Sequence, residues 1–302
     1  MNARVDRVSD DLSLITLTPP RKGFTNFISA WLYRAEISFL VDVGPSATAR
    51  GLLESLQNLD VTHLDYILLT HIHLDHAGAI AEIATQFPQT PIVCHEAAIP
   101  HLVDPSRLWE GTRKVLGSMA DAYGPIRPVA ADRLVDAAQF SSNEIGPIIT
   151  PGHAAHHVSY NTDRYLFAGE TAGVCYSLDR NKVYMRPATP PRFFLETAIN
   201  SLDLLLECNP TNLCYGHYGI RKNAMQMLQT HREQILLWAD TIREVIADTA
   251  SPDPIDACIQ RLLDVDPLMA RLHDLQDEVQ EREKYFLQNS LRGFIGYLER
   301  EG

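Results

Sequence analysis

The sequence predicts a layered α/β domain followed by an all-helical segment. Between residues 65 and 95 a short apolar stretch, a helical pattern and a second apolar stretch follow one another, as strands and helices do in an α/β domain. After about residue 223 the apolar residues recur at helical spacing and no strand pattern intervenes. We therefore predict a main domain over residues 1–222 and a helical C-terminal segment over residues 223–302.

The composition is that of an acidic globular protein. The 302 residues are enough for one large domain or for a domain with an appendage. Hydrophobic residues make up 45% and charged residues 21%, which allows a substantial core. A net charge of −12 lacks the overall basic footprint of a nucleic-acid binder. We therefore expect a small-molecule substrate and no nucleic-acid partner.

The chain has no targeting or membrane-spanning pattern. The first residues lack an apolar signal core, and no run of about 18 apolar residues occurs. The five cysteines are scattered, odd in number and without CxxC spacing, which favours free thiols in a reducing compartment. We expect a cytoplasmic protein without a membrane partner, and a homodimer is left open.

The N-terminal part predicts strands and one helix. Residues 12–17 alternate between apolar and polar, and residues 26–33 and 37–43 form a hairpin pattern. A helix is expected near residues 47–57. Asp42, at the end of the hairpin, either hydrogen-bonds a neighbouring functional loop or caps a turn, and the sequence leaves both open.

The central part alternates strands and helices. An inserted helix is expected over residues 106–123, where it could form the wall of a pocket. The other predicted elements are helices at 77–87 and 195–207, and strands at 65–70, 91–95, 145–150, 158–161, 164–170 and 212–215.

The C-terminal segment predicts four helices and is acidic. Residues 223–302 hold eight Lys and Arg against fifteen Asp and Glu. This acidity indicates either a solvated appendage or, as we prefer, a segment whose inner face covers an active site or a partner subunit. The four helical patterns cover residues 224–248, 255–264, 267–277 and 282–300.

The stretch 70–78 carries the strongest chemical signal in the chain. It places His71, His73, Asp75 and His76 directly after an apolar strand pattern. Histidine and carboxylate ligands without cysteine suit Zn, Fe or Mn. The alternative, surface histidines on a polar loop, is disfavoured because the spacing is dense and further histidines follow downstream.

Three more metal-competent residues follow apolar strand patterns. His153 stands in Pro-Gly-His, Glu170 in Phe-Ala-Gly-Glu and His217 in Gly-His-Tyr-Gly. If each follows a strand end, all of the candidate ligands converge at one edge of a sheet, where they are held more firmly than on free loops.

These motifs resemble the metallo-β-lactamase fold superfamily, and most closely its glyoxalase II-like hydrolases. The resemblance covers roughly residues 10–220, and helical C-terminal segments also occur among hydroxyacylglutathione hydrolases and quinolone-response thioesterases. It implies a four-layer αββα sandwich with a dinuclear metal site at one edge of two sheets. By position, the first metal would be held by His71, His73 and His153, and the second by Asp75, His76 and His217, with Glu170 as the bridge.

The resemblance implies a dinuclear metal-dependent hydrolase with two divalent ions, zinc first and iron or manganese as alternatives. A metal pair lowers the pKa of a shared water from 15.7 towards 7, and the hydroxide attacks an ester-like bond. A thioester is the preferred substrate, and a lactone or a phosphodiester is the alternative. Asp75 is also expected to orient the hydroxide or pass on a proton. One departure is Glu170, because the family usually has Asp at the bridging position.

Two other functional classes remain open. A di-iron redox enzyme on the same fold would have Glu where His73 stands and an added flavin domain, and neither is present. A signalling or binding protein with residual hydrolase activity would keep the metal site without significant turnover.

Residues near the motifs receive smaller roles. His157 is interpreted as support behind the ligands, and His156 as pointing away. Tyr218 is expected either to stabilise an oxyanion or to pack. Substrate contacts are expected from the stretch between Glu170 and His217, although aromatic residues there are more often core. The candidates are Arg186, Phe193 and Phe194.

Overall fold

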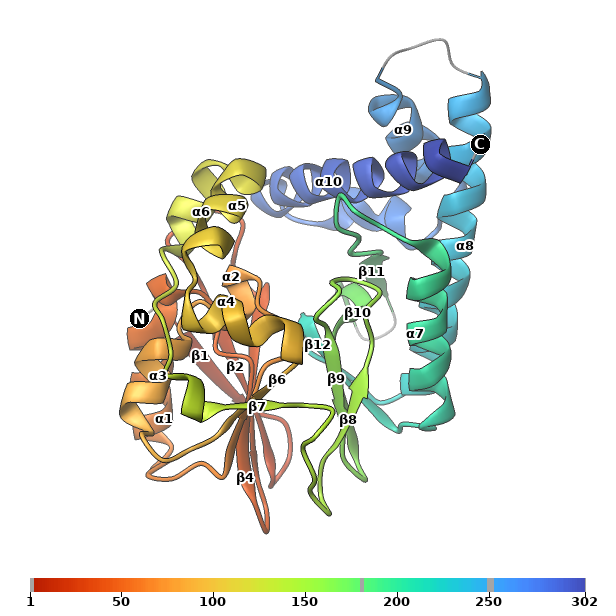
Figure 1. Cartoon of the computed structure of the whole chain (residues 1–302). Helices are drawn as coiled ribbons and strands as arrows, with labels where there is room; N and C mark the ends of the chain where they lie inside the picture. The colour runs from red at the N-terminus through yellow and green to blue at the C-terminus, as the bar shows by residue number, and fades with distance from the viewer. Residues whose placement is uncertain (1–2, 180–181, 249–252, 302) are drawn as a thin grey trace.

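Two β-sheets packed face to face, with helices on both outer sides, form the main body of the protein (Figure 1). The structure is a computed structural model, and it describes residues 3–179, 182–248 and 253–301. The expected four-layer αββα fold with a helical C-terminal region is confirmed.

The first sheet takes its strands in chain order, β1 to β7. Neighbours from β1 to β4 are antiparallel, and neighbours from β4 to β7 are parallel. The parallel strands are short and mostly buried, as expected for a sheet covered on both faces. The strands are β1 (Ala3–Arg7), β2 (Leu12–Leu17), β3 (Ile28–Arg34), β4 (Ser38–Val41), β5 (Tyr66–Leu68), β6 (Ile92–Cys94) and β7 (Leu134–Asp136).

The second sheet has the order β13-β12-β10-β9-β8, and β11 pairs with β10 beside this path. Its long strand β10 is parallel to β12 and antiparallel to β9 and β11. The strands are β8 (Gly146–Ile149), β9 (Val158–Asn161), β10 (Tyr165–Ser177), β11 (Val183–Arg186), β12 (Asn212–His217) and β13 (Ile220–Arg221).

The inner faces of the sheets share one apolar core. Trp31 and Phe39 of the first sheet lie in one buried cluster with Tyr160 and Phe167 of the second. Two buried polar groups also join the sheets, because the Tyr160 hydroxyl donates to the Leu69 carbonyl (3.0 Å) and the Trp31 indole to the Tyr215 carbonyl (3.0 Å). A buried donor that finds a partner in the facing sheet fixes how the two sheets sit on each other.

Helices cover the outer faces. α1 (Ala49–Asn58) and α3 (Ile80–Gln86) lie on the first sheet, and α7 (Leu195–Glu207) and α8 (Ala224–Asp248) lie on the second. The remaining α-helices are α2 (Leu74–Ala77), α4 (Ile99–Val103), α5 (Ser106–Leu116), α6 (Ser118–Tyr123), α9 (Ile255–Val265) and α10 (Asp277–Glu301).

The helix α10 runs across one end of the sandwich, from α5 and α6 to α8 (Figure 1). The Tyr285 hydroxyl donates to the Leu116 carbonyl (3.2 Å), which joins α10 to the end of α5. Over the described residues, no helix is long and apolar enough to cross a membrane.

Two helix predictions are wrong in detail. The expected single helix over 106–123 is broken at Gly117, whose φ of +53° lies in the region that favours glycine, so that α5 and α6 are separate. The expected α-helix over 267–277 is a 3₁₀ helix at Met269–Asp274.

Candidate metal centre

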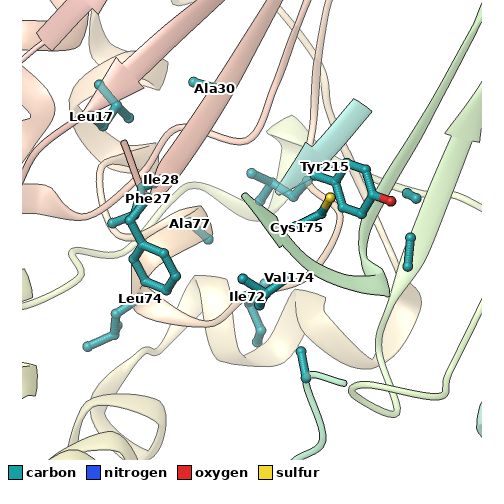
Figure 2. Packing of buried hydrophobic residues seen from close by; sticks show 14 of the residues in the cluster. Leu17, Phe27, Ile28, Ala30, Ile72, Leu74, Ala77, Val174, Cys175 and Tyr215 are labelled. Carbon is teal, nitrogen blue, oxygen red and sulfur yellow. The ribbon is translucent and has the colours of Figure 1, made fainter. Parts of the chain in front are cut away.

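The metal loop, residues 70–78, leaves β5 and continues into α2. Its apolar side chains Ile72, Leu74 and Ala77 are buried in the core cluster that also holds Phe27 (Figure 2). Gly78 passes very close to a neighbouring turn, because a Cβ there would lie 2.8 Å from the Ser46 amide nitrogen and 2.9 Å from Pro45 Cα. The buried apolar side chains therefore fix the loop to the core, and its ionisable side chains point away from the core.

The sequence-predicted ligands lie together in two groups. The donor atoms within each group lie within 4.8 Å of one another. The first group comes from the metal loop, from the turn after β8 and from β10, and the second from α2 and the end of β12. The first group is His71, His73, His153 and Glu170, and the second is Asp75, His76 and His217.

Asp42 holds the metal loop from behind. Its carboxylate accepts hydrogen bonds from the Thr70 amide (2.8 Å) and the Thr70 hydroxyl (2.8 Å), and lies 2.9 Å from His76 Nδ1. Asp42 is 2% exposed. Of the two roles left open by the sequence, it therefore has the first: it hydrogen-bonds the functional loop and orients one of its imidazoles.

The first group directs lone pairs at a common point. His153 donates from Nδ1 to the Ala188 carbonyl (2.6 Å), and His71 donates from Nδ1 to the Thr70 hydroxyl (3.0 Å). In the neutral form that binds metal ions, an imidazole has one donor and one acceptor nitrogen, so both Nε2 atoms then carry lone pairs. These atoms lie 3.1 Å and 3.0 Å from His73 Nδ1. A metal ion bound between these three ring nitrogens would accept all of their lone pairs.

The second group repeats this arrangement. His76 donates from Nδ1 to Asp42, and His217 donates from Nδ1 to the Phe27 carbonyl (3.0 Å). In the neutral, metal-binding form of both rings, their Nε2 atoms face each other at 3.2 Å as two acceptors. The Asp75 carboxylate lies 3.5 Å from His217 Nε2 and adds negative charge. Both donor sets therefore fit divalent metal ions, which bind neutral imidazole and carboxylate oxygen.

Glu170 lies between the two groups. Its Oε2 is 3.0 Å from His153 Nε2 and 3.2 Å from His71 Nε2, and its Oε1 is 3.5 Å from His217 Nε2. The expectation that every ligand follows a strand end is wrong for Glu170, because β10 continues to Ser177. The β10–β12 register shifts on both sides of Gly169, and this irregularity replaces the strand end.

Gly169 and His157 set the position of Glu170. His157 Nε2 accepts a hydrogen bond from the Glu170 amide (3.2 Å), and its Nδ1 lies 2.9 Å from the Thr150 hydroxyl. Gly169 has a φ of +53°, and a Cβ there would lie 2.4 Å from His157 Nε2. Only glycine fits this close approach. His157 thus lies behind the ligands, where the sequence placed it.

Burial and charge act in opposite directions on the cluster. Burial lowers the pKa of His73 to about 3 and lowers the pKa of His71 well below its usual range, which keeps both imidazoles neutral. Burial opposes ionisation of Glu170, but His153 and His217 outweigh it and hold the pKa of that carboxyl well below its usual range.

Burial also opposes protonation of His153 and His76, but Glu170 outweighs it and raises the pKa of His153, and Asp42 raises the pKa of His76 well above its usual range. Without a metal ion, protons are therefore held between these imidazoles and the carboxylates, and a bound cation would replace them.

A cavity of about 370 Å³ opens above the two groups. His73, Asp75, His153, Glu170 and His217 form its floor. Its walls come from α5, from residues 186–191 and from α10. This volume is in the usual range for small-molecule sites.

The candidate substrate residues lie in different places. Arg186 lines the cavity, but it is buried and its Nε donates to Glu283 (2.5 Å). Phe193 is a core residue whose ring lies 4.6 Å from that of Phe294, and exposed Phe194 is not among the cavity residues. Phe193 therefore packs in the core and Phe194 faces solvent, and neither lies in the lining of this cavity.

Tyr218 and His156 resolve two further expectations. The Tyr218 hydroxyl lies 2.9 Å from the Thr16 hydroxyl and accepts a hydrogen bond from Arg4 (2.8 Å), so it packs against the first sheet and lies outside the cavity lining. His156 lines the cavity, so the expectation that it points away is wrong. Burial lowers the pKa of His156 to about 4.

The sequence did not reveal the groups that set the imidazole orientations. These include the backbone carbonyls of Phe27 and Ala188, which accept from His217 and His153. Phe27 also stacks on His217 at a centroid distance of 4.0 Å and an interplanar angle of 8°. A carbonyl carries no residue-type signal, and Phe27 stands outside any motif, so only the folded chain shows them.

Two packed sheets flanked by helices, with seven histidine and carboxylate side chains gathered at one edge, define an α/β protein built around a candidate metal site. Residues 24–217 match the sequence profile described as the Metallo-beta-lactamase superfamily. The chain belongs to this family, whose members are generally metal-dependent hydrolases.

Several relatives support this assignment. A metallo-β-lactamase fold-containing protein from Sulfurisphaera tokodaii, ST1585, is 30% identical over 182 residues, which cover 57% of this chain and 67% of that protein. Anaerobic nitric oxide reductase flavorubredoxins of Escherichia coli are 38% identical over 72 residues, which cover 24% of this chain and 15% of theirs. This chain therefore spans only a small part of the flavorubredoxins.

Solved structures show the same fold. ST1585 from Sulfolobus tokodaii, described as an archaeal metallo-β-lactamase superfamily protein, superposes with a TM-score of 0.70 at 22% identity, over 95% of this chain and 99% of that chain. The metallo-β-lactamase family protein TTHA1429 from Thermus thermophilus superposes with a TM-score of 0.66 at 18% identity, over 98% and 95%. At these identities the likeness concerns the fold alone.

Proposed function

We propose that this protein is a dinuclear metal-dependent hydrolase that acts on an ester-like bond, with a thioester as its first substrate class. The observation that carries the proposal is the convergence of acceptor nitrogens in both ligand groups, with Glu170 between them. Metal ions bound there would supply an activated water and stabilisation of the developing oxyanion.

The residues of the chain divide the remaining work. The six histidine and aspartate side chains would hold two metal ions, and Glu170, which lies between the two groups, would contribute its carboxylate to both. Asp75 lines the cavity and lies 3.5 Å from His217, so it can also orient water or accept a proton beside the second position. The cavity walls position the acyl part of the substrate and exclude water.

The thioester is preferred on two grounds. The motif resemblance is closest to glyoxalase II-like hydrolases, and the cavity above the cluster has mainly apolar walls that suit an uncharged acyl group. A lactone offers the same reacting carbonyl and is the near alternative. A phosphodiester would bring an anion against the apolar walls and is third.

A redox enzyme with a di-iron centre is a second candidate from another class. It is favoured by the 72-residue match to flavorubredoxins. It is disfavoured by His73, where the di-iron proteins of this fold have Glu. A binding or signalling protein that keeps the metals without turnover is the third class. Iron-dependent consumption of nitric oxide or oxygen would favour the redox hypothesis over the hydrolase.

The test combines metal analysis with a substrate panel. The protein is loaded with Zn, Fe or Mn, its metal content is measured by elemental analysis, and kcat/KM is determined on acyl-CoA, acylglutathione, homoserine lactone and bis-nitrophenyl phosphate. We expect two metal ions per chain and the highest kcat/KM on a thioester. The expected effect of Asp75→Asn is a loss of roughly 10²-fold or more in kcat, as for removal of a general acid or base.

His63→Ala is the control, because His63 is an exposed histidine that pairs with Asp65 (3.2 Å) and does not line the cavity. It should leave metal content and kcat unchanged. Negligible turnover on the whole panel, with two metals tightly held, would overturn the hydrolase and favour the binding protein.

A further inference from the structure

The cavity above the candidate metal centre has an unusual wall. α5 lines it with Leu108, Gly111, Thr112 and Val115, which are spaced as one face of a helix. Yet no residue of α5 is buried, and Val115 is 53% exposed. The helix therefore turns an apolar face toward an open space and not toward a packed core.

The opposite walls are largely apolar, and their uncharged polar members are Thr189, Asn289 and Ser290. Phe286 of α10 and Phe27 line the cavity, together with Ala188, Pro190 and Pro191 from the segment after β11. The apolar walls are continuous with the floor, where the candidate ligands lie. A single substrate can therefore place its reacting bond beside the candidate ligands and the rest of its chain between α5 and α10.

The cavity offers little to a charged ligand. Of the two guanidinium groups that line it in the described part of the chain, Arg186 is already paired with Glu283, and Arg107 stands at the exposed start of α5. A glutathionyl or nucleotide group carries several charges and needs ionic partners. A charged group of this kind is better placed in solvent outside the cavity. The interior of the cavity suits an uncharged acyl chain.

We propose that this cavity binds the apolar acyl chain of the substrate, with α5 and α10 as its two walls. A methylene takes up about as much space as a water molecule, about 30 Å³ in the liquid, so the volume suits an acyl chain of roughly six to ten carbon atoms beside the reacting group. This inference rests on the proposed hydrolase function, because it assigns the acyl half of that enzyme's substrate.

A chain-length series tests the inference. The metal-loaded protein is assayed on S-acyl N-acetylcysteamine thioesters from acetyl to dodecanoyl, in which the thiol half is small and uncharged. Burial of each methylene contributes about 0.8 kcal/mol, so KM should fall about 4-fold per added methylene until the cavity is full, and then level off or rise.

Gly111 allows the cavity to be filled without disturbing the fold. Gly111 lines the cavity, and a Cβ added there meets no atom within 4 Å. Gly111→Leu should raise KM for the octanoyl thioester at least tenfold, and by a much larger factor than KM for the acetyl thioester. Replacement of a helical glycine by another residue also stabilises the helix. Gly111→Ala has this effect on the helix but adds only one methyl group to the cavity, so it separates the two effects.

Glu110→Leu is the matched control on the other side of α5. Glu110 is exposed, does not line the cavity and borders a surface depression with Arg113 and Lys114. The Glu110→Leu variant introduces the same side chain one residue away, outside the cavity, and should leave KM unchanged for every substrate. If Glu110→Leu and Gly111→Leu raised KM for octanoyl substrates equally, the assignment of the cavity would be overturned.

A binding measurement separates this inference from the proposed function. Calorimetric titration of the metal-loaded protein with n-alkanols from butan-1-ol to decan-1-ol should give tighter binding with length, and Gly111→Leu should weaken octan-1-ol binding. Turnover of the acetyl thioester with no dependence of KM on chain length and no alkanol binding would overturn the chain site and leave the hydrolase intact. Length-dependent alkanol binding without turnover of any substrate in the panel, thioesters included, would support the chain site and overturn the hydrolase.

Discussion

At the scale of the residue, Glu170 is the single side chain on which both ligand groups depend. Its two oxygens reach His153 and His71 on one side and His217 on the other. Removal of the Glu170 carboxylate would leave the ligand nitrogens in place but take away negative charge that two bound cations need. We expect Glu170→Ala to reduce bound metal to one ion per chain or fewer, as measured by elemental analysis after gel filtration. Wild-type metal content in this variant would contradict the bridging role.

Glu170→Asp is the informative companion to this variant, because Asp is the residue that the family usually has. It keeps the charge and shortens the reach by one methylene. If the cluster is built around the longer side chain, Glu170→Asp should keep the metal at the histidine-rich first group and weaken binding at the second. Competition with a chromophoric chelator measures the two affinities separately.

His231 makes a pH-dependent contribution to stability away from the ligands. It is 1% exposed, and burial lowers its pKa from 6.5 to about 4. Between these pH values the unfolded chain binds a proton that the folded chain does not, so the contribution is present above pH 6.5 and is lost as the pH falls towards 4. The full loss is about 3 kcal/mol.

The measurement compares the wild type with His231→Gln, which keeps a polar side chain that cannot be protonated. Urea unfolding at pH 7 and pH 4.5, in the same metal state, should show the wild type losing about 2 to 3 kcal/mol more than the variant on acidification. Parallel losses in both proteins would mean that His231 is not protonated on unfolding in this range.

At the scale of the element, α10 contributes to the metal centre through a stack of side chains. The Arg282 guanidinium lies 4.1 Å from the centroid of the Phe27 ring, and that ring stacks on His217 at 4.0 Å. Arg282 is held in place by Glu283 (3.1 Å) and by the Tyr176 hydroxyl (2.8 Å). The C-terminal helix is thus linked to one of the predicted ligands without touching it.

We expect Arg282→Met to have two effects. It breaks a buried ion pair and leaves Glu283 with Arg186 as its remaining charged partner, which should lower the free energy of unfolding by roughly 3 kcal/mol. It also frees the Phe27 ring, and should weaken metal binding at the group that contains His217. Cobalt titration followed by visible absorption measures the second effect.

Arg282→Lys separates position from charge, because it keeps the cation and removes the planar fork that stacks on the ring. Intermediate metal affinity is expected for this variant. If Arg282→Met lost stability while both cobalt affinities stayed at wild-type values, the role of α10 would be purely structural.

The elements also show what a sequence can and cannot predict. Periodicity placed β2 and β9 well, because their side chains alternate or are buried between clear turns. It missed β1, at the edge of the first sheet, and β7, whose residues are only partly buried. Neither strand has a clear hydrophobic pattern, and both are defined by pairing with a neighbouring strand. The candidate ligand residues could be picked out of the sequence by their types and spacing. The position of Glu170 in the middle of β10, and the backbone carbonyls that accept hydrogen bonds from the imidazoles, are seen only in the folded chain.

At the scale of the whole molecule, the helical C-terminal segment and the sandwich share a core. One buried cluster contains Leu17 and Leu32 of the first sheet, Leu213 of the second, and Trp238 and Phe294 of the C-terminal helices. Gln234 of α8 also donates to the Met185 carbonyl (2.8 Å) of β11. The predicted boundary near residue 222 separates two patterns in the sequence, and we expect it not to separate two units that unfold independently.

Two tryptophans report on the two parts and provide the test. Trp31 lies between the sheets, and Trp238 lies in α8, where its indole donates to Asp266 (2.7 Å). In a Trp109→Phe background, Trp31→Phe and Trp238→Phe each leave one reporter. If the shared core makes unfolding cooperative, the fluorescence transitions of both variants should coincide in urea with the transition by circular dichroism, after correction for each variant's own stability. An earlier transition of Trp238 alone would show that the C-terminal helices detach first, and α10 could then open the cavity without unfolding the metal centre.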